Sequence, residues 1–202
     1  MMERIRCSYP LAFVLALMLL FDSGGDLLLL LAAAAIHELG HIGALMLMGA
    51  GIRCIRLTLG GAVIEYNGSR VSYLGDAAAA LAGPAASLLT CFVMAATAGP
   101  DPSELLCYFA GLNLMLGLFN LAPVMPLDGG RAVLCLLCAV RSPREAEQIS
   151  GLLTGIAGCG LLLVGGGLLL KAGNPSLLLI SLVVLLSDGD KTSLQERIFG
   201  LL

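Results

Sequence analysis

Two histidines and a glutamate lie within five consecutive residues, at a spacing that suits metal chemistry. His37 and His41 are the two histidines of this 202-residue chain. Residues four apart on a helix share one face, about 5–6 Å from each other, so both imidazoles can reach one Zn²⁺. Glu38 lies about 100° further round the helix, where it can reach a metal-bound water without binding the metal. The pattern predicts a hydrolytic zinc site with Glu38 as general base.

The surroundings of this motif strengthen the prediction. The motif lies in an apolar stretch from Leu27 to about Met48, where an unpaired ionisable side chain costs several kcal/mol. A histidine pair could also bind haem or relay protons, but haem binding does not require the intervening Glu38. Gly40 leaves the helix surface bare, so the backbone of a neighbouring helix could approach closely here.

A catalytic zinc takes three protein ligands and keeps one position for water, so a third ligand is needed. With no further histidine, the candidates are the carboxylates of Asp76, Glu65 and Asp128. Asp76 could cap a span, and Glu65 lies in a strand-like, solvated stretch. Asp128 lies in 122–131, which two prolines and two glycines prevent from forming a regular helix. Irregular backbone at membrane depth lines a cavity or is buried in protein. We therefore predict Asp128 as the third ligand; the alternative is an N-cap for a short helix over 131–140.

The composition indicates a membrane protein. The chain is 58% hydrophobic and 12% charged, whereas soluble domains carry about 25% charged residues. Apolar stretches of about 20 residues recur, the length that a bilayer requires. We predict an all-α polytopic membrane protein with about six transmembrane helices, at 7–21, 27–48, 74–98, 104–121, 149–170 and 176–187. We expect a single domain over 1–202, with a zinc-site core at 27–131 and accessory spans at 7–21 and 149–187.

Residues 52–66 differ from the spans, because they alternate and are rich in β-branched side chains. With Gly60-Gly61 between the two halves, they predict a small membrane-associated β-hairpin. A substrate helix hides its peptide bonds in its own hydrogen bonds and must unwind before hydrolysis. We therefore expect the hairpin to take up the unwound segment by strand addition. Gly60 and Gly61 are predicted to bind substrate, as is Pro126.

The basic residues predict an orientation. Six spans with the N-terminus inside place ten of the eleven Lys and Arg residues in the cytoplasm and leave Lys171 outside. Both termini and the access to the site are then cytoplasmic, in a membrane expected to be the bacterial cytoplasmic membrane. The partners expected are the lipid bilayer and a membrane protein, and no nucleic acid. The seven cysteines form no disulfide framework, and Cys135 and Cys138 are predicted to be buried.

Three segments together resemble the site-2 protease family: His37-Glu-Leu-Gly-His41, Ala82-Gly-Pro84, and Phe119-Asn-Leu-Ala-Pro-Val-Met-Pro-Leu-Asp-Gly-Gly-Arg131. In that family a helical H-E-x-x-H and a distant N-x-x-P-x-x-P-x-D-G build one zinc site inside the membrane. The resemblance, which covers about residues 27–131, implies His37, His41 and Asp128 as ligands. It also implies that Asn120 helps to position substrate or the oxyanion; the alternative role of Asn120 is a helix-end cap.

The resemblance implies an intramembrane zinc metalloprotease that hydrolyses a peptide bond in or near a transmembrane segment. The layout is most similar to the sporulation-type branch, which cleaves a membrane-associated pro-sigma factor, and we expect a form of it without a CBS domain after the last span. An inhibitory membrane partner or a homo-oligomer is also expected. The alternatives are a prenyl-protein or quality-control protease, whose third ligand is usually a Glu on a later helix, and a non-proteolytic metal-binding membrane protein. A transporter would repeat polar ligands across several spans.

Overall fold

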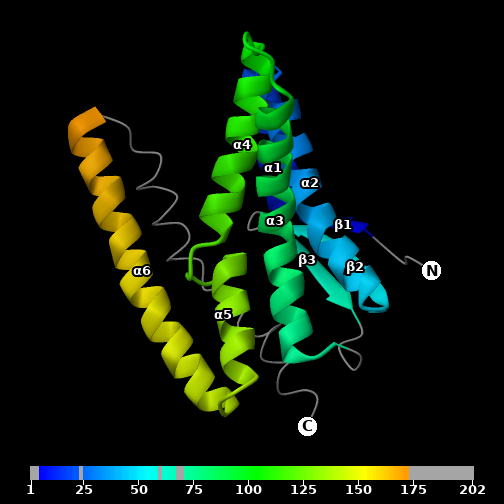
Figure 1. Cartoon of the computed structure of the whole chain (residues 1–202), viewed down its shortest axis with the longest axis vertical. Coiled ribbons are helices and arrows are strands. Elements are labelled where there is room, and N and C mark those ends of the chain that lie inside the picture. Colours follow the sequence, from blue (N-terminus) through cyan, green and yellow to red (C-terminus); the bar gives the residue numbers. More distant parts are fainter. Residues whose placement is uncertain (1–4, 23–24, 59–60, 67–70, 173–202) are drawn as a thin grey trace. The chain divides into compact units, whose positions relative to one another are not determined.

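The computed structural model describes residues 5–22, 25–58, 61–66 and 71–172. The chain divides into two compact units, Met1–Phe119 and Asn120–Leu202. Figure 1 shows the helices and strands of both. The sixth predicted span, 176–187, lies outside the described residues. The expectation of a single domain over 1–202 stays a prediction.

Four helices form most of the first unit, and their ends follow from the sequence. Ser8 caps the first helix by accepting from the backbone N–H of Leu11, and Ser72 caps the third by accepting from that of Gly75. The second and third helices and, in the second unit, α6 (Pro143–Ala172) are long and apolar enough to cross a membrane. In the described part of the chain these are three candidate spans. The first and fourth helices lie where spans were predicted, but they are shorter. The four helices are α1 Tyr9–Phe21, α2 Asp26–Leu47, α3 Tyr73–Thr97 and α4 Glu104–Asn120.

Small residues let α2 and α3 pack closely. A Cβ on Gly40 would lie 2.5 Å from the carbonyl oxygen of Ala82 and 2.8 Å from Cβ of Ala86. In the bilayer, where lipid and side chain are equally apolar, such close backbone approach is what holds helices together. The predicted role of Gly40 is confirmed, and α3 is the helix that approaches it.

The predicted hairpin is present as β2, Ile52–Thr58, and β3, Gly61–Tyr66, which pair antiparallel. A further strand, β1, Ile5–Cys7, pairs parallel with β2, giving the order β1-β2-β3. Three residues next to an apolar span carry no strand signal, so the sequence did not predict β1. The hydrophobic core that joins α2, the hairpin and α3 consists of Leu45, Ala50, Ile64 and Ala79.

The second unit contains α5, Asp128–Cys138, and α6, Pro143–Ala172. The short helix expected over 131–140 therefore begins three residues earlier, and the prediction of irregular backbone was wrong for 128–131. Leu127 is the N-cap of α5 and Asp128 is its first residue, so Asp128 does not cap this helix. The prediction that Cys135 and Cys138 are buried is confirmed.

The start of α6 shows why a polar stretch is helical. Ser142 and Glu145 form a capping box: the backbone N–H of Ser142 donates to Glu145 Oε2 at 3.4 Å, and the N–H of Glu145 donates to Ser142 Oγ at 3.5 Å. Pro143 occupies the first helical position, where its missing N–H costs nothing. Residues 143–148, which precede the fifth predicted span at 149–170, therefore belong to the same helix.

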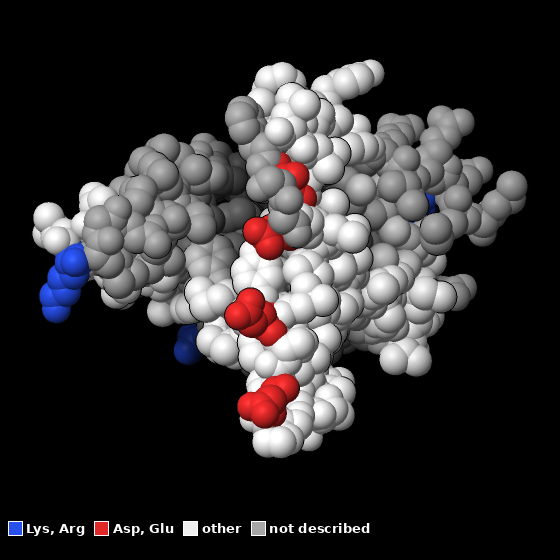
Figure 2. Space-filling view, turned by 90° about the horizontal axis from the view of Figure 1, so that it is seen from above, with Lys and Arg blue, Asp and Glu red and all other residues white. Residues whose placement is uncertain are grey.

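Acidic residues gather where α2 and α4 begin. Asp22 and Asp26 flank the start of α2, and Asp101 and Glu104 flank the start of α4. Figure 2, which looks down on the upper end of Figure 1, shows several acidic side chains on this face. These residues lie between the first and second and between the third and fourth predicted spans, so an N-terminus inside the cytoplasm predicts that they lie outside it.

Candidate metal centre

The two histidines lie side by side on one buried face of α2. The exposed fractions are 5% for His37 and 8% for His41. Their ring centroids are 5.0 Å apart, with an angle of 77° between the ring planes. The helical spacing thus brings the imidazoles together as the sequence predicted.

Both rings are hydrogen-bonded at Nδ1 by α3. His41 Nδ1 lies 2.7 Å from the carbonyl oxygen of Ala79, and His37 Nδ1 lies 3.0 Å from Oγ of Ser87. A carbonyl oxygen only accepts, so Nδ1 of His41 carries the proton and the lone pair is at Nε2. Neither partner was predicted. Ser87 gave a signal, a hydroxyl within an apolar span, but Ala79 acts through its backbone and gave none.

A glycine on α3 makes room for the His41 ring. A Cβ on Gly83 would lie 2.1 Å from His41 Nε2 and 2.5 Å from Cε1. Any other residue at position 83 would displace this ring, which explains the glycine of Ala82-Gly-Pro84. Two buried imidazoles, hydrogen-bonded at Nδ1 and seated against a bare backbone, suit Zn²⁺, which accepts imidazole nitrogen as a ligand.

The predicted base lies beside the hairpin. The backbone N–H of Ala62 donates to Oε1 of Glu38 at 3.1 Å. Gly61 precedes it with φ of 112°, a conformation that favours glycine, and a Cβ there would lie 3.7 Å from the same oxygen. The start of β3 therefore reaches the carboxylate next to the histidine pair, whereas Gly60 lies outside the described residues.

The two other carboxylates considered as ligands have partners elsewhere. Glu65 on β3 forms a 2.5 Å ion pair with Arg56 on β2, and both side chains are more than a third exposed. Asp76, in the first turn of α3, accepts a hydrogen bond from the hydroxyl of Tyr66. The Glu65 ion pair thus joins the two strands of the hairpin, and the Asp76 hydrogen bond joins the hairpin to α3.

Asp128 and the rest of its motif belong to the second unit. A Cβ on Gly129 would lie 2.2 Å from the carbonyl oxygen of Leu121, and one on Gly130 would lie 2.6 Å from the carbonyl carbon of Val124. The two glycines thus let the irregular segment fold tightly against the start of α5. Asn120 ends α4, and a cis peptide bond precedes Pro126.

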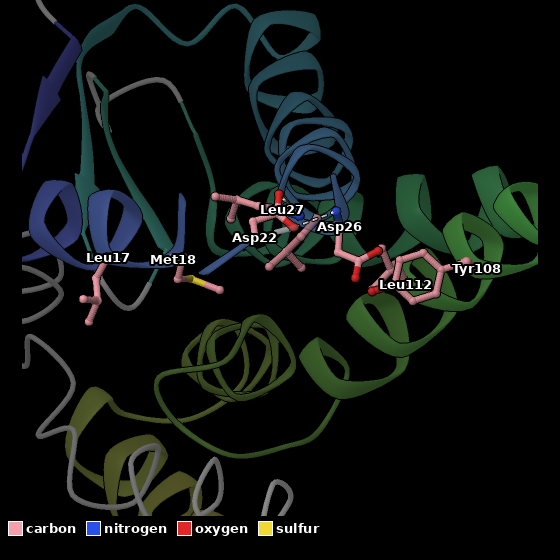
Figure 3. A pocket seen from close by; sticks show the side chains of 8 residues that line it. Leu17, Met18, Asp22, Asp26, Leu27, Tyr108 and Leu112 are labelled. Atoms are coloured by element: carbon pink, nitrogen blue, oxygen red, sulfur yellow. Dashed lines mark hydrogen bonds between the residues drawn. The ribbon is translucent and has the colours of Figure 1, made fainter. Parts of the chain in front are cut away.

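A cavity of about 420 Å³ lies among α1, α2 and α4, away from the zinc motif (Figure 3). Its walls are mainly apolar. The carboxylate of Asp22 accepts from the backbone N–H groups of Asp26 and Leu27, at 3.1 and 3.4 Å, and so caps α2, whose N-cap residue is Gly25. The Asp22 carboxylate therefore has a structural role. The lining residues are Leu17, Met18, Asp22, Asp26, Leu27, Leu30, Tyr108 and Leu112.

Part of this chain, including the motif that contains Asp128, resembles a known protein family. Residues 95–164 match the sequence model of Peptidase family M50. This region includes Asn120, Pro126 and Asp128 but not the histidine pair.

Two curated relatives align with longer parts of the chain. Rip3 of Mycobacterium tuberculosis, provisionally described as a zinc metalloprotease, is 35% identical over 117 residues, which is 54% of this chain and 30% of the relative. A zinc metalloprotease of Methanocaldococcus jannaschii is 29% identical over 163 residues, 78% of this chain and 46% of the relative. The chain thus spans less than half the length of these relatives.

The fold has a counterpart among solved structures. The site-2 protease from Methanocaldococcus jannaschii superposes with a TM-score of 0.61 at 27% identity, covering 86% of this chain and 82% of that one. This match covers most of both chains, whereas the matches to the curated relatives cover less than half of each relative. The chain is thus similar to Peptidase family M50 in its sequence, to zinc metalloproteases among the relatives and to a site-2 protease in its fold.

Proposed function

We propose that this chain is an intramembrane zinc metalloprotease that hydrolyses a peptide bond in or near a transmembrane segment of a membrane protein. One observation carries the proposal: a buried His37–His41 pair, with Nδ1 of each ring hydrogen-bonded, lies beside Glu38 on a helix long enough to cross a membrane. The named relatives are described as zinc metalloproteases, in the case of Rip3 provisionally, which supports the same chemistry.

His37, His41 and Asp128 are the proposed ligands. The sequence motif supports Asp128, and the pairing of Glu65 with Arg56 and of Asp76 with Tyr66 argues against the other two candidates. When bound, zinc polarises the scissile carbonyl and lowers the pKa of a bound water towards about 7.

Glu38 takes the proton from the attacking water and passes it to the leaving amine. The N–H of Ala62 donates to one oxygen of this carboxylate and so helps to orient the base. Asn120 positions the substrate or stabilises the oxyanion, the role that the motif resemblance implies. Burial of the histidine pair limits access of bulk water and strengthens these polar interactions.

The substrate segment adds to the hairpin as an extended strand. β3 is an edge of the sheet, and its residue Ala62 faces Glu38, so a strand added there would pass the base. Gly60, Gly61 and Pro126 are the residues proposed to contact substrate. Prolines placed one at a time along 61–66 test this: cleavage falls while zinc content stays unchanged. Cleavage that survives every proline would contradict strand addition.

The site opens to the cytoplasm in this proposal, and the membrane is the bacterial cytoplasmic membrane. The acidic residues at the starts of α2 and α4 support the orientation, since the loops 22–26 and 99–104 that hold them contain no Lys or Arg. A sporulation-type substrate and an inhibitory membrane partner or second copy of the chain remain part of the proposal. The M50 match favours this class over a prenyl-protein protease.

The decisive experiment combines metal analysis with cleavage. The purified full chain should bind about one zinc. On co-expression with candidate single-span substrates, wild type should cleave and Glu38→Gln should not, although Glu38→Gln keeps its zinc. Glu104→Gln, at the start of α4 and outside the proposed site, is the matched control and should cleave like wild type. Cleavage by the Glu38→Gln variant would reject the mechanism.

A further inference from the structure

The hydrogen bonds to the two histidines differ in kind. His41 Nδ1 faces the carbonyl oxygen of Ala79, which can only accept, so the tautomer of His41 is fixed by the backbone. His37 Nδ1 faces Oγ of Ser87, and a hydroxyl can either donate or accept. The backbone therefore fixes the tautomer of His41, whereas the hydroxyl that faces Nδ1 of His37 is compatible with either tautomer.

The direction of the Ser87 bond decides whether His37 can bind metal through Nε2. If Nδ1–H donates to Oγ, the lone pair is at Nε2. If the hydroxyl donates to Nδ1 instead, the proton is at Nε2 and blocks coordination there. Ser87 is fully buried, with an exposed fraction of 0%, so water cannot replace it as the partner of Nδ1.

We infer that Ser87 is a positioning residue, which accepts from His37 Nδ1–H and thereby holds His37 in the tautomer and ring orientation that bind zinc. The inference rests on the proposed function, because it takes His37 as a ligand. Outer partners of metal-bound histidines fix ring orientation and tautomer, and losing one lowers metal affinity by roughly 10–100-fold.

The test compares Ser87→Ala with Ser87→Thr, which keeps a hydroxyl, and with Thr90→Val. Thr90 lies on the same helix and donates its hydroxyl to the carbonyl of Ala86 at 2.8 Å, so Thr90→Val removes a hydroxyl that does not contact a histidine. The full chain is purified in micelles, and its zinc affinity is measured by competition with a chelator. We expect Ser87→Ala to bind zinc about 10–100-fold more weakly, with Thr90→Val unchanged and Ser87→Thr closer to wild type.

A second measurement separates positioning from a general loss of structure. The chain has two histidines, so ¹⁵N-histidine labelling gives two ring spin systems whose couplings report the tautomer. His37→Gln assigns them. In zinc-loaded wild type both rings should carry the proton on Nδ1. Metal-free Ser87→Ala is compared with metal-free wild type. Only the His37 ring should differ, as a mixture of tautomers, while His41 keeps its Nδ1 proton.

Two results would overturn the inference: unchanged zinc affinity in Ser87→Ala, or equal changes in both rings, which indicate a structural role only. These measurements need no substrate. If zinc binds as expected but Glu38→Gln still cleaves, the proposed mechanism fails and the role of Ser87 stands. A wild-type chain that binds no zinc would reject both.

Discussion

The backbone N–H of Ala62 donates a 3.1 Å hydrogen bond to Oε1 of Glu38, which joins the first residues of β3 to the proposed catalytic base. The hairpin therefore has a second function besides the proposed binding of substrate, because it orients the carboxylate. A hydrogen bond to an ionised carboxylate is roughly twice as strong as one between neutral groups.

Ala62→Pro removes this donor. The Ala62 N–H bonds Glu38 and not β2, so the ladder between the strands should survive. We expect cleavage to fall at least tenfold with zinc content unchanged, since Glu38 loses the bond that orients it. Ala62→Ser, which keeps the N–H, serves as the control in a co-expression cleavage assay. Equal cleavage by the Pro and Ser variants would show that the hydrogen bond from Ala62 to Glu38 does not affect catalysis.

Gly83→Ala should abolish zinc binding. Its Cβ would lie 2.1 Å from His41 Nε2, so the ring must leave its position on α2. Gly111→Ala on α4, where nothing lies within 4 Å of the added Cβ, is the matched control and should bind zinc normally. Metal analysis of both purified variants is sufficient. Wild-type zinc content in Gly83→Ala would mean that His41 is not a ligand in this orientation.

Asp128→Ala tests the third ligand. We expect its zinc affinity to fall by more than the roughly 10–100-fold typical of losing an outer partner, because a direct metal bond is lost. Chelator competition measures it. Asp101→Ala, in the loop before α4, should keep wild-type affinity. If Glu65→Ala or Asp76→Ala weakens zinc binding and Asp128→Ala does not, the ligand was assigned wrongly.

Cys138 should resist alkylation at pH 8. Burial against Leu134 and Ala146, and secondarily the Glu147 carboxylate, raise the pKa of the Cys138 thiol above its ordinary value. Few thiolates then form, whereas the exposed Cys7 should react readily. Variants that keep a single cysteine, treated with iodoacetamide at a series of pH values, give both rates.

The raised pKa also gives a direction for stability. The folded state favours the protonated thiol, so this contribution is fully present below the ordinary thiol pKa and is lost as pH rises through the raised value. Glu147→Gln should shift the reaction of Cys138 to lower pH, since it removes the neighbouring negative charge. An unchanged pH profile in that variant would leave burial as the whole cause.

The sequence by itself determined the parts of the site that depend on neighbouring residues. Helical periodicity brings His37 and His41 together whatever surrounds them, because i and i+4 share a face. Alternation around Gly60-Gly61 was enough to predict the hairpin. Apolar length was enough to predict α2 and α3 as spans, and the bareness of Gly40 predicted a close helix neighbour.

Contacts between distant residues were decided only in the tertiary structure. The hydrogen bonds of the histidines to Ala79 and Ser87, and of Glu38 to Ala62, join residues 24 to 50 positions apart. Two of these three partners act through their backbone, which every residue type shares, so no side-chain pattern marks them. The start of α5 at Asp128 was missed because Gly129 and Gly130, which disfavour a helix locally, are needed there for close contact with 121–124.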